Sequence, residues 1–154
     1  MTIRPARPSD IEVMSGIIGH HASEGLMLPR SRAGLLTSLQ HYLVADHNGA
    51  IVGCGGLQPY TTSSGEIYGL ATSPHHSQRG TGSAIVQALI ERARSESLSR
   101  VFALTLAPEF FTKMGFRTVE HTDLPEKVWR DCVACPKFGN CDEVAMVLEL
   151  HALK

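Results

Sequence analysis

A short glycine-containing loop between an expected strand and an expected helix restricts the fold of this chain more than any other segment. Residues 66–72 alternate in the manner of a strand, and residues 85–93 carry the apolar pattern of a helix. Between them, Gly80 and Gly82 stand at the start of the helix. Glycines let a backbone approach an anion closely, and the unpaired N–H groups of a first helical turn attract phosphate. The loop is therefore a candidate diphosphate site, with ordinary glycines at a helix start as the alternative.

Two common phosphate loops do not match this segment. A nucleoside-triphosphate loop requires Gly-Lys-Ser/Thr after its last glycine, and a dinucleotide fingerprint requires a third glycine where Ile85 stands. The segment instead resembles the Arg/Gln-x-x-Gly-x-Gly/Ala diphosphate loop of the GCN5-related N-acetyltransferases (GNAT), with Ser77 at the leading position. Residues 109–116, Glu-Phe-Phe-Thr-Lys-Met-Gly-Phe, are similar to the family's Phe-Tyr-x-Lys-x-Gly-Phe segment. The resemblance covers essentially the whole chain.

Local signals mark the elements at the start of the chain. Ser9 and Glu12 have the spacing of a capping box before a helix that runs to about His20, and Ser31 is the expected cap of a second helix. Asn48-Gly49 between two alternating runs predicts a hairpin turn. Strands are expected at residues 3–6, 42–45, 50–57, 66–72, 100–106, 116–120 and 144–150, and further helices at residues 80–95 and 108–114.

The order of these elements is that of the acetyltransferase fold. The resemblance implies a single-domain α/β (α+β) fold with a mixed central sheet of about six to seven strands, flanked by about four helices and splayed between its fourth and fifth strands. Strict alternation in the fourth strand would place Glu66, Tyr68 and Leu70 on one face and Ile67, Gly69 and Ala71 on the other.

Composition limits the partners. The length of 154 residues favours one domain, residues 1–154, and 14 Lys and Arg against 15 Asp and Glu give a net charge of −1. This balance gives no excess of positive charge that would attract nucleic acid or an anionic lipid surface, so we expect small-molecule substrates. The sequence leaves open whether the protein forms a homodimer. The chain has no apolar run of membrane-spanning length, and its first residues lack the apolar core of a signal peptide. We therefore expect a cytoplasmic protein.

The four cysteines fit a reducing compartment. Cys54 lies alone in an expected strand, as a small buried residue does. Cys132, Cys135 and Cys141 have the spacing Cys-x2-Cys-x5-Cys, which could wrap a structural zinc ion if a carboxylate or a distant histidine supplied the fourth ligand. The second Cys-x2-Cys or His pair of a zinc finger is absent from the sequence. We therefore favour a reduced, metal-free loop over zinc.

Three further segments narrow the resemblance from the acetyltransferase family as a whole to one group within it. Residues 28–31 (Leu-Pro-Arg-Ser), 102–105 (Phe-Ala-Leu-Thr) and 124–137 look like those of N-acetylglutamate synthases, in particular the short forms that consist of the acetyltransferase domain alone. The resemblance implies acetyl transfer from acetyl-CoA to the α-amino group of L-glutamate, the first step of arginine biosynthesis. Larger relatives add an amino-acid-kinase-like domain, for which these residues leave no room.

The same resemblance implies where acetyl-CoA binds. The diphosphate lies on the glycine loop, and the end of the fourth strand offers backbone N–H groups to the acetyl and pantetheine end, where an oxyanion develops. The implied coenzyme contacts are Leu70, Ala71, Thr72, Gln78, Arg79, Gly80, Thr81, Gly82 and Ser83.

Acetyl transfer to an amine requires a base for the ammonium group and an acid for the leaving thiolate. Glu66 matches the position of the family's catalytic glutamate, with a solvated strand-edge carboxylate as the alternative. Many relatives use a tyrosine as the acid, and here Phe111 occupies that position. Thr105 is the candidate substitute, with an ordinary strand threonine as the alternative and with water also able to serve.

An acceptor with two carboxylates requires two cations. Arg30 matches a substrate-binding arginine of the family, and Lys127 is the candidate for the second carboxylate; a surface cation is the alternative for both. Two other functions stay open: an acetyltransferase for another small amine or amino acid, and a non-catalytic acetyl-CoA sensor.

Overall fold

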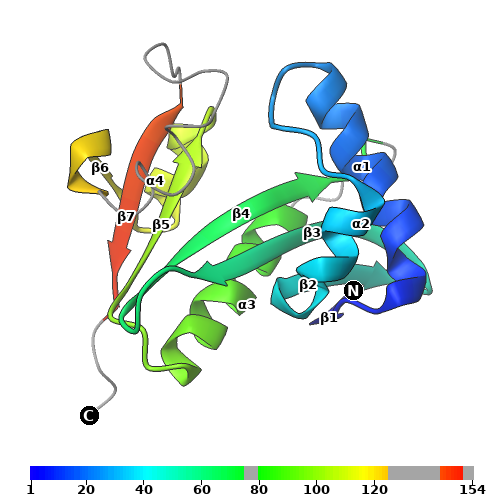
Figure 1. Cartoon of the computed structure of the whole chain (residues 1–154), viewed down its shortest axis with the longest axis horizontal. Coiled ribbons are helices and arrows are strands. Elements are labelled where there is room, and N and C mark those ends of the chain that lie inside the picture. Colours follow the sequence, from blue (N-terminus) through cyan, green and yellow to red (C-terminus); the bar gives the residue numbers. More distant parts are fainter. Residues whose placement is uncertain (75–79, 125–142, 151–154) are drawn as a thin grey trace. The chain divides into compact units, whose positions relative to one another are not determined.

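The computed structural model describes residues 1–74, 80–124 and 143–150. The order of elements in these ranges is the predicted one: a strand, two helices, three strands, a helix, a strand, a helix and two strands (Figure 1). The elements are β1 (Thr2–Pro5), η1 (Pro8–Asp10), α1 (Ile11–Ser23), α2 (Arg32–Thr37), η2 (Leu39–His41), β2 (Tyr42–His47), β3 (Ala50–Pro59), β4 (Ser64–Thr72), α3 (Thr81–Ser95), β5 (Arg100–Thr105), α4 (Pro108–Lys113), β6 (Arg117–Val119), η3 (His121–Asp123) and β7 (Val144–Glu149).

Within these ranges the strands form one seven-stranded mixed sheet in the order β1-β2-β3-β4-β5-β7-β6, which confirms the predicted mixed sheet of about six to seven strands. β4 and β5 pair in parallel through residues 64–66 and 100–102, whereas β5 pairs with β7, and β7 with β6, in antiparallel fashion. The parallel pairs of β4 with β5 in the described residues are those of the first three residues of β4.

The chain groups into two compact units, which we describe one at a time. Residues 1–58 and 67–92 make up the first, and residues 59–66 and 93–154 the second, so that β4 contributes to both. The single domain that we expect over residues 1–154 stays a prediction.

In the first unit, helices cover both faces of the strands. On one face lie α1 and α2 (Figure 1). They bury a cluster of side chains against β2, β3 and β4. On the other face α3 packs so closely on β3 that a Cβ atom at Gly55 would lie 2.9 Å from Ile85. The buried cluster under α1 and α2 contains Met14, Ile17, Ile18, Leu35, Tyr42, Val44, Cys54, Tyr68 and Ala71.

Of the two helix caps predicted at the start of the chain, the structure confirms one and contradicts the other. Ser31 caps α2 as expected, because its hydroxyl accepts a hydrogen bond from the N–H of Gly34 at 3.0 Å. The capping box at Ser9 is wrong: Ser9 lies within the turn η1, and α1 begins after Asp10. The Asp10 carboxylate accepts from the N–H of Arg7 at 2.8 Å and binds Arg4, so an ion pair with β1 fixes this helix start.

The alternation predicted along β4 is also wrong after Tyr68. Gly69 has φ +61°, a left-handed conformation that favours glycine, and it acts as a bulge that inserts one residue into the alternation. As a result Tyr68 and Ala71 both join the cluster under α1 and α2. Leu70 instead lies on the α3 side, where a Cβ atom at Gly55 would meet it at 3.2 Å.

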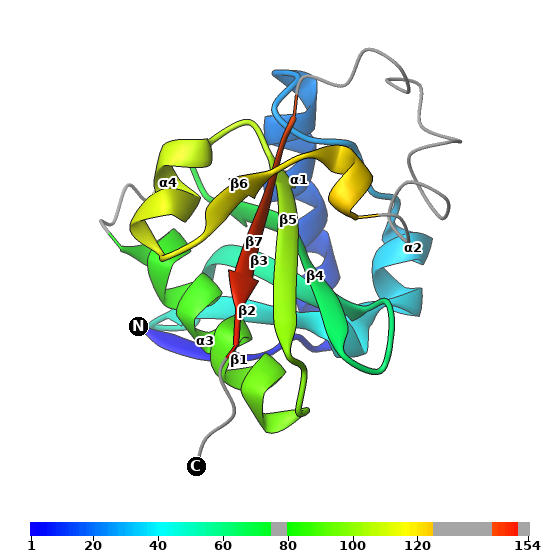
Figure 2. The same ribbon diagram turned by 90° about the vertical axis from the view of Figure 1, so that its left-hand side faces the viewer.

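The second unit builds a smaller core around β5. Figure 2 shows β5, β7 and β6 side by side, with α4 next to them. Phe102 lies opposite Val147 and Leu104 opposite Ala145, so these four side chains share one face. Phe111 of α4 packs edge to face on Phe116, with ring centroids 5.1 Å apart. The core on the Phe102 face also takes in Tyr60, Val119 and Leu124.

Candidate functional site

Arg30 presents a cation on the surface of the first unit. It lies in the segment between α1 and α2, which Met27 anchors by packing against the buried cluster. Its guanidinium carbon lies 4.6 Å from the centroid of the Tyr68 ring. Within the described ranges no hydrogen bond or ion pair engages this guanidinium, whereas the neighbouring Arg32 binds Glu12. No partner among the described residues therefore competes for the Arg30 guanidinium, and its binding of a substrate carboxylate stays a prediction.

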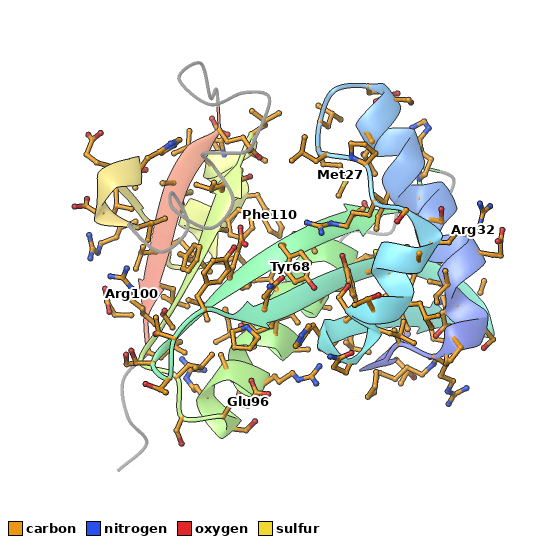
Figure 3. All side chains as sticks on the ribbon, in the orientation of Figure 1. Met27, Arg32, Tyr68, Glu96, Arg100 and Phe110 are labelled. Atoms are coloured by element: carbon orange, nitrogen blue, oxygen red, sulfur yellow. The ribbon has the colours of Figure 1, made fainter. Side chains whose placement is uncertain are left out.

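Two buried tyrosines, Tyr68 and Tyr42, lie between Arg30 and the core of the first unit. Tyr68 is 7% exposed and Tyr42 is fully buried, with ring centroids 5.2 Å apart (Figure 3 labels Tyr68). Burial raises the pKa of the Tyr42 hydroxyl, and the nearby positive charge of Arg30 opposes this shift only in part. Burial likewise raises the pKa of the Cys54 thiol to about 12, and the thiol donates to the carbonyl oxygen of Gly69 at 3.6 Å. The side chains of Tyr42 and Cys54 near Arg30 are therefore neutral groups.

The end of β4, where acetyl-CoA contacts are expected, is held by α1. The Nε2 atom of His21 lies 2.8 Å from the carbonyl oxygen of Thr72, which ties the last turn of α1 to the last residue of the strand. Ala71 is buried in the core and Leu70 faces α3, so both could offer backbone rather than side chains to a ligand. The sequence analysis assigned no role to His21. Two adjacent histidines, here His20 and His21, give no sequence signal for a contact with a distant backbone carbonyl.

The described part of the glycine loop leaves open space at the start of α3. Gly80 has φ +91°, and a Cβ atom there would meet no other atom within 4 Å. Its carbonyl oxygen accepts from the N–H of Ala84 at 2.8 Å, which starts α3. The first turn of α3 contains no acidic residue, so the positive end of this 15-residue helix is not neutralised from within. Gly82 and Ser83 are partly exposed and Thr81 is buried, while Gln78 and Arg79 lie outside the described residues.

The two candidate catalytic side chains belong to the second unit. Glu66 is 5% exposed and lies opposite Phe102 in the parallel ladder, which puts its side chain on the Phe102 face. A solvated strand-edge carboxylate is therefore not what the structure contains. Thr105 lies three residues after Phe102, on the opposite face of β5. Its hydroxyl oxygen accepts from the N–H of Ala107 at 2.8 Å, a contact that shapes the turn into α4 and leaves the hydroxyl proton free to be donated.

Several predicted residues cannot be placed. Lys127, Cys132, Cys135 and Cys141 lie outside the described residues, so the second substrate cation and the zinc alternative stay predictions. In the ranges that the structure does describe, no three His, Cys, Asp or Glu side chains gather in a way that could hold a metal ion. Among the same residues, no helix is long and apolar enough to cross a membrane.

Comparison with known proteins gives consistent matches. The model of the acetyltransferase (GNAT) family matches residues 20–116. A Chlorobaculum tepidum protein named as an uncharacterized N-acetyltransferase is 37% identical over 148 residues, 96% of either protein. An amino-acid acetyltransferase of Mycobacterium tuberculosis is 33% identical over 155 residues, 99% of this chain and 86% of that protein.

Solved structures agree with these matches. A Mycobacterium tuberculosis protein in complex with CoA has a TM-score of 0.85 at 28% identity, over 98% of this chain and 100% of that chain. N-acetylglutamate synthase from Neisseria gonorrhoeae, complexed with coenzyme A and N-acetyl-glutamate, has a TM-score of 0.88 at 30% identity. This second match covers 97% of the present chain but 35% of the synthase chain.

Proposed function

Because this chain belongs to the acetyltransferase (GNAT) family, we propose that it transfers the acetyl group of acetyl-CoA to the α-amino group of an amino acid, with L-glutamate as the acceptor. This is the first step of arginine biosynthesis. The observation that carries the amino-acid part is the guanidinium of Arg30, which lies over the Tyr68 ring and whose donors meet no partner in the described part of the chain, as a carboxylate ligand would require.

Acetyl-CoA binding rests on the start of α3. Gly80 leaves open space beside the backbone, and the N–H groups of Thr81, Gly82 and Ser83 belong to the first helical turn, where a diphosphate is stabilised. Solved relatives named above hold CoA. The backbone from Leu70 to Thr72 would then lie along the acetyl end, with Thr72 fixed by His21.

The reaction is a direct displacement on the thioester. The amine nitrogen attacks the carbonyl carbon, the C–N bond forms and the C–S bond breaks, giving the N-acetyl amino acid and the CoA thiolate. Glu66 takes the proton that the ammonium group must lose. Thr105 or a water molecule gives a proton to the thiolate, and the second proton, which the nitrogen loses as the amide forms, replaces it. Backbone N–H groups at the end of β4 stabilise the negative oxygen that forms on the carbonyl.

A substrate panel with free-thiol detection tests this proposal. L-Glutamate, L-glutamine, a neutral amino acid and a cationic amine are compared at fixed acetyl-CoA, and glutamate should give the highest kcat/KM. Arg30→Ala should raise the KM for glutamate roughly 10- to 150-fold, which corresponds to the ~1.5–3 kcal/mol of a hydrogen bond to a charged group. The matched control is Arg32→Ala, because Arg32 is an exposed neighbour with its own partner, Glu12.

The same panel separates the other two functions. Turnover of a cationic or uncharged amine in preference to glutamate would identify a different small-amine acetyltransferase. Binding of acetyl-CoA without CoA release from any acceptor would identify a sensor. An Arg30→Ala variant that acetylates glutamate as well as the parent would remove Arg30 from the acceptor site.

A further inference from the structure

Arg30 is a long, exposed side chain, yet one contact restrains it. The guanidinium group lies over the face of the Tyr68 ring at 4.6 Å, within the distance at which a cation and a ring attract each other. A guanidinium that meets an aromatic ring with its flat face keeps its five N–H donors directed outward from its edge, because they lie in its plane.

The ring that supports Arg30 is itself held on several sides. A Cβ atom at Gly56 would lie 2.7 Å from Cε1 of Tyr68, so the ring lies directly against the backbone of β3. The ring of Tyr42 contacts it from another side, at 5.2 Å between centroids. The bulge at Gly69 directly follows Tyr68 and places the next residues of β4 around Tyr42. Tyr68 is therefore a fixed platform for the side chain of Arg30, and an arginine side chain is flexible when nothing supports it.

We propose that Tyr68 is a positioning residue that holds the Arg30 guanidinium flat and thereby makes this site selective for a planar carboxylate on the acceptor. The stack removes in advance the rotamer freedom that an unsupported arginine would lose on binding. A carboxylate can then accept two parallel hydrogen bonds from the exposed edge. This inference rests on the proposed function, because it takes the Arg30 ligand to be the carboxylate of the acceptor.

Kinetics of four variants and one double variant test the proposal. Tyr68→Leu should raise the KM for glutamate about 2- to 30-fold, since cation–π contacts of about 0.5–2 kcal/mol convert to that range at 1.4 kcal/mol per tenfold change. The kcat value and the KM for acetyl-CoA should change less than twofold. Tyr68→Phe keeps the ring, so its KM should lie closer to the parent than to Tyr68→Leu. Arg30→Lys should resemble Arg30→Ala, because an ammonium group cannot offer the planar pair of donors.

The double variant gives the decisive comparison. If Tyr68 acts through Arg30, adding Tyr68→Leu to Arg30→Ala should raise the KM no further. A structural role of Tyr68 would instead lower activity by a similar factor in both backgrounds, and that result would overturn the proposal. Equal KM values for Tyr68→Leu and the parent would overturn it as well.

Nuclear magnetic resonance separates this inference from the proposed function. The Nε–H signal of Arg30 should be that of an ordered group in the parent and in Tyr68→Phe, and that of a mobile group in Tyr68→Leu. Titration with L-glutamate should shift this signal at lower concentration in the parent than in Tyr68→Leu. Such a shift without any release of CoA would refute the acetylation of glutamate and support the carboxylate site. A mobile Arg30 signal in the parent would refute the positioning role even if glutamate is acetylated.

Discussion

Replacing Gly69 by alanine tests the bulge that sets the faces of β4. Gly69 has φ +61°, and a Cβ atom there would lie 2.5 Å from the hydroxyl oxygen of Tyr42. The left-handed conformation disfavours a side chain by ~1–2 kcal/mol, and an added methyl group in a packed core typically destabilises by ~1–3 kcal/mol. We therefore expect Gly69→Ala to lower the free energy of unfolding by roughly 2–5 kcal/mol.

The Tyr42→Phe background separates these two contributions. Removing the hydroxyl leaves Cε1 of the ring as the nearest atom to the new methyl group, at 3.1 Å, which is tight but not a severe overlap. In that background Gly69→Ala should lower the free energy of unfolding by only ~1–2 kcal/mol, the part due to the backbone conformation. Urea denaturation of all four proteins gives the comparison as a double-mutant cycle.

Gly16 provides the matched control. It lies inside α1, and a Cβ atom there would meet nothing within 4 Å. Gly16→Ala should therefore leave the free energy of unfolding unchanged or raise it by about 0.5–1 kcal/mol, because alanine is the better helix former. The account of the bulge is refuted if Gly69→Ala is as stable as the parent. An equal loss in both Tyr42 backgrounds would show that the hydroxyl makes no contribution.

Three further changes have defined outcomes. The hydrogen bond from Arg4, opposed by burial, lowers the pKa of Asp10 in the folded protein. The stabilisation from this carboxylate is therefore present above its unfolded pKa and is lost as the pH falls through its folded pKa. Urea denaturation at pH 7 should show that Asp10→Asn lowers the free energy of unfolding by about 1–3 kcal/mol, and this difference should shrink toward pH 3. Glu66→Gln should slow acetylation most at neutral pH and less as pH rises, because alkali supplies the free amine; a loss of rate that does not vary with pH would indicate positioning instead. Gly82→Glu should weaken acetyl-CoA binding in calorimetry by placing an anion against the diphosphate, and unchanged affinity would exclude the loop from the site.

The element order was predictable because each element carries its own local signal. The hairpin is an example: Asn48 and Gly49 both adopt positive φ, at 54° and 89°, as the dipeptide predicts. The start of α1 was not predictable in this way, because Asp10 is bound by Arg4, and the pairing of β1 with β2 brings a second carboxylate, Asp46, to the same arginine. A three-residue spacing around Ser9 cannot reveal a partner on another element.

The bulge shows where a rule of period two fails. Nothing in the alternation of β4 requires an inserted residue, and a lone glycine in a strand is the only local sign of one. The insertion reverses the face of Leu70 and leaves Tyr68 under Arg30. Arg30 could be selected from the resemblance, but its platform could not, because their contact forms only when distant segments fold together.

In the proposed function, the two substrates depend on different kinds of structure. The proposed coenzyme site at the start of α3 uses backbone N–H groups and an open glycine, which a short run of sequence specifies by itself. The proposed acceptor site uses the side chains of Arg30 and Tyr68, whose geometry depends on β3, β4 and the segment before α2. A few substitutions at these positions can change the acceptor while the coenzyme loop stays the same. Relatives that share the loop but lack the arginine on its ring should bind the same acetyl donor and differ in the amine that they acetylate.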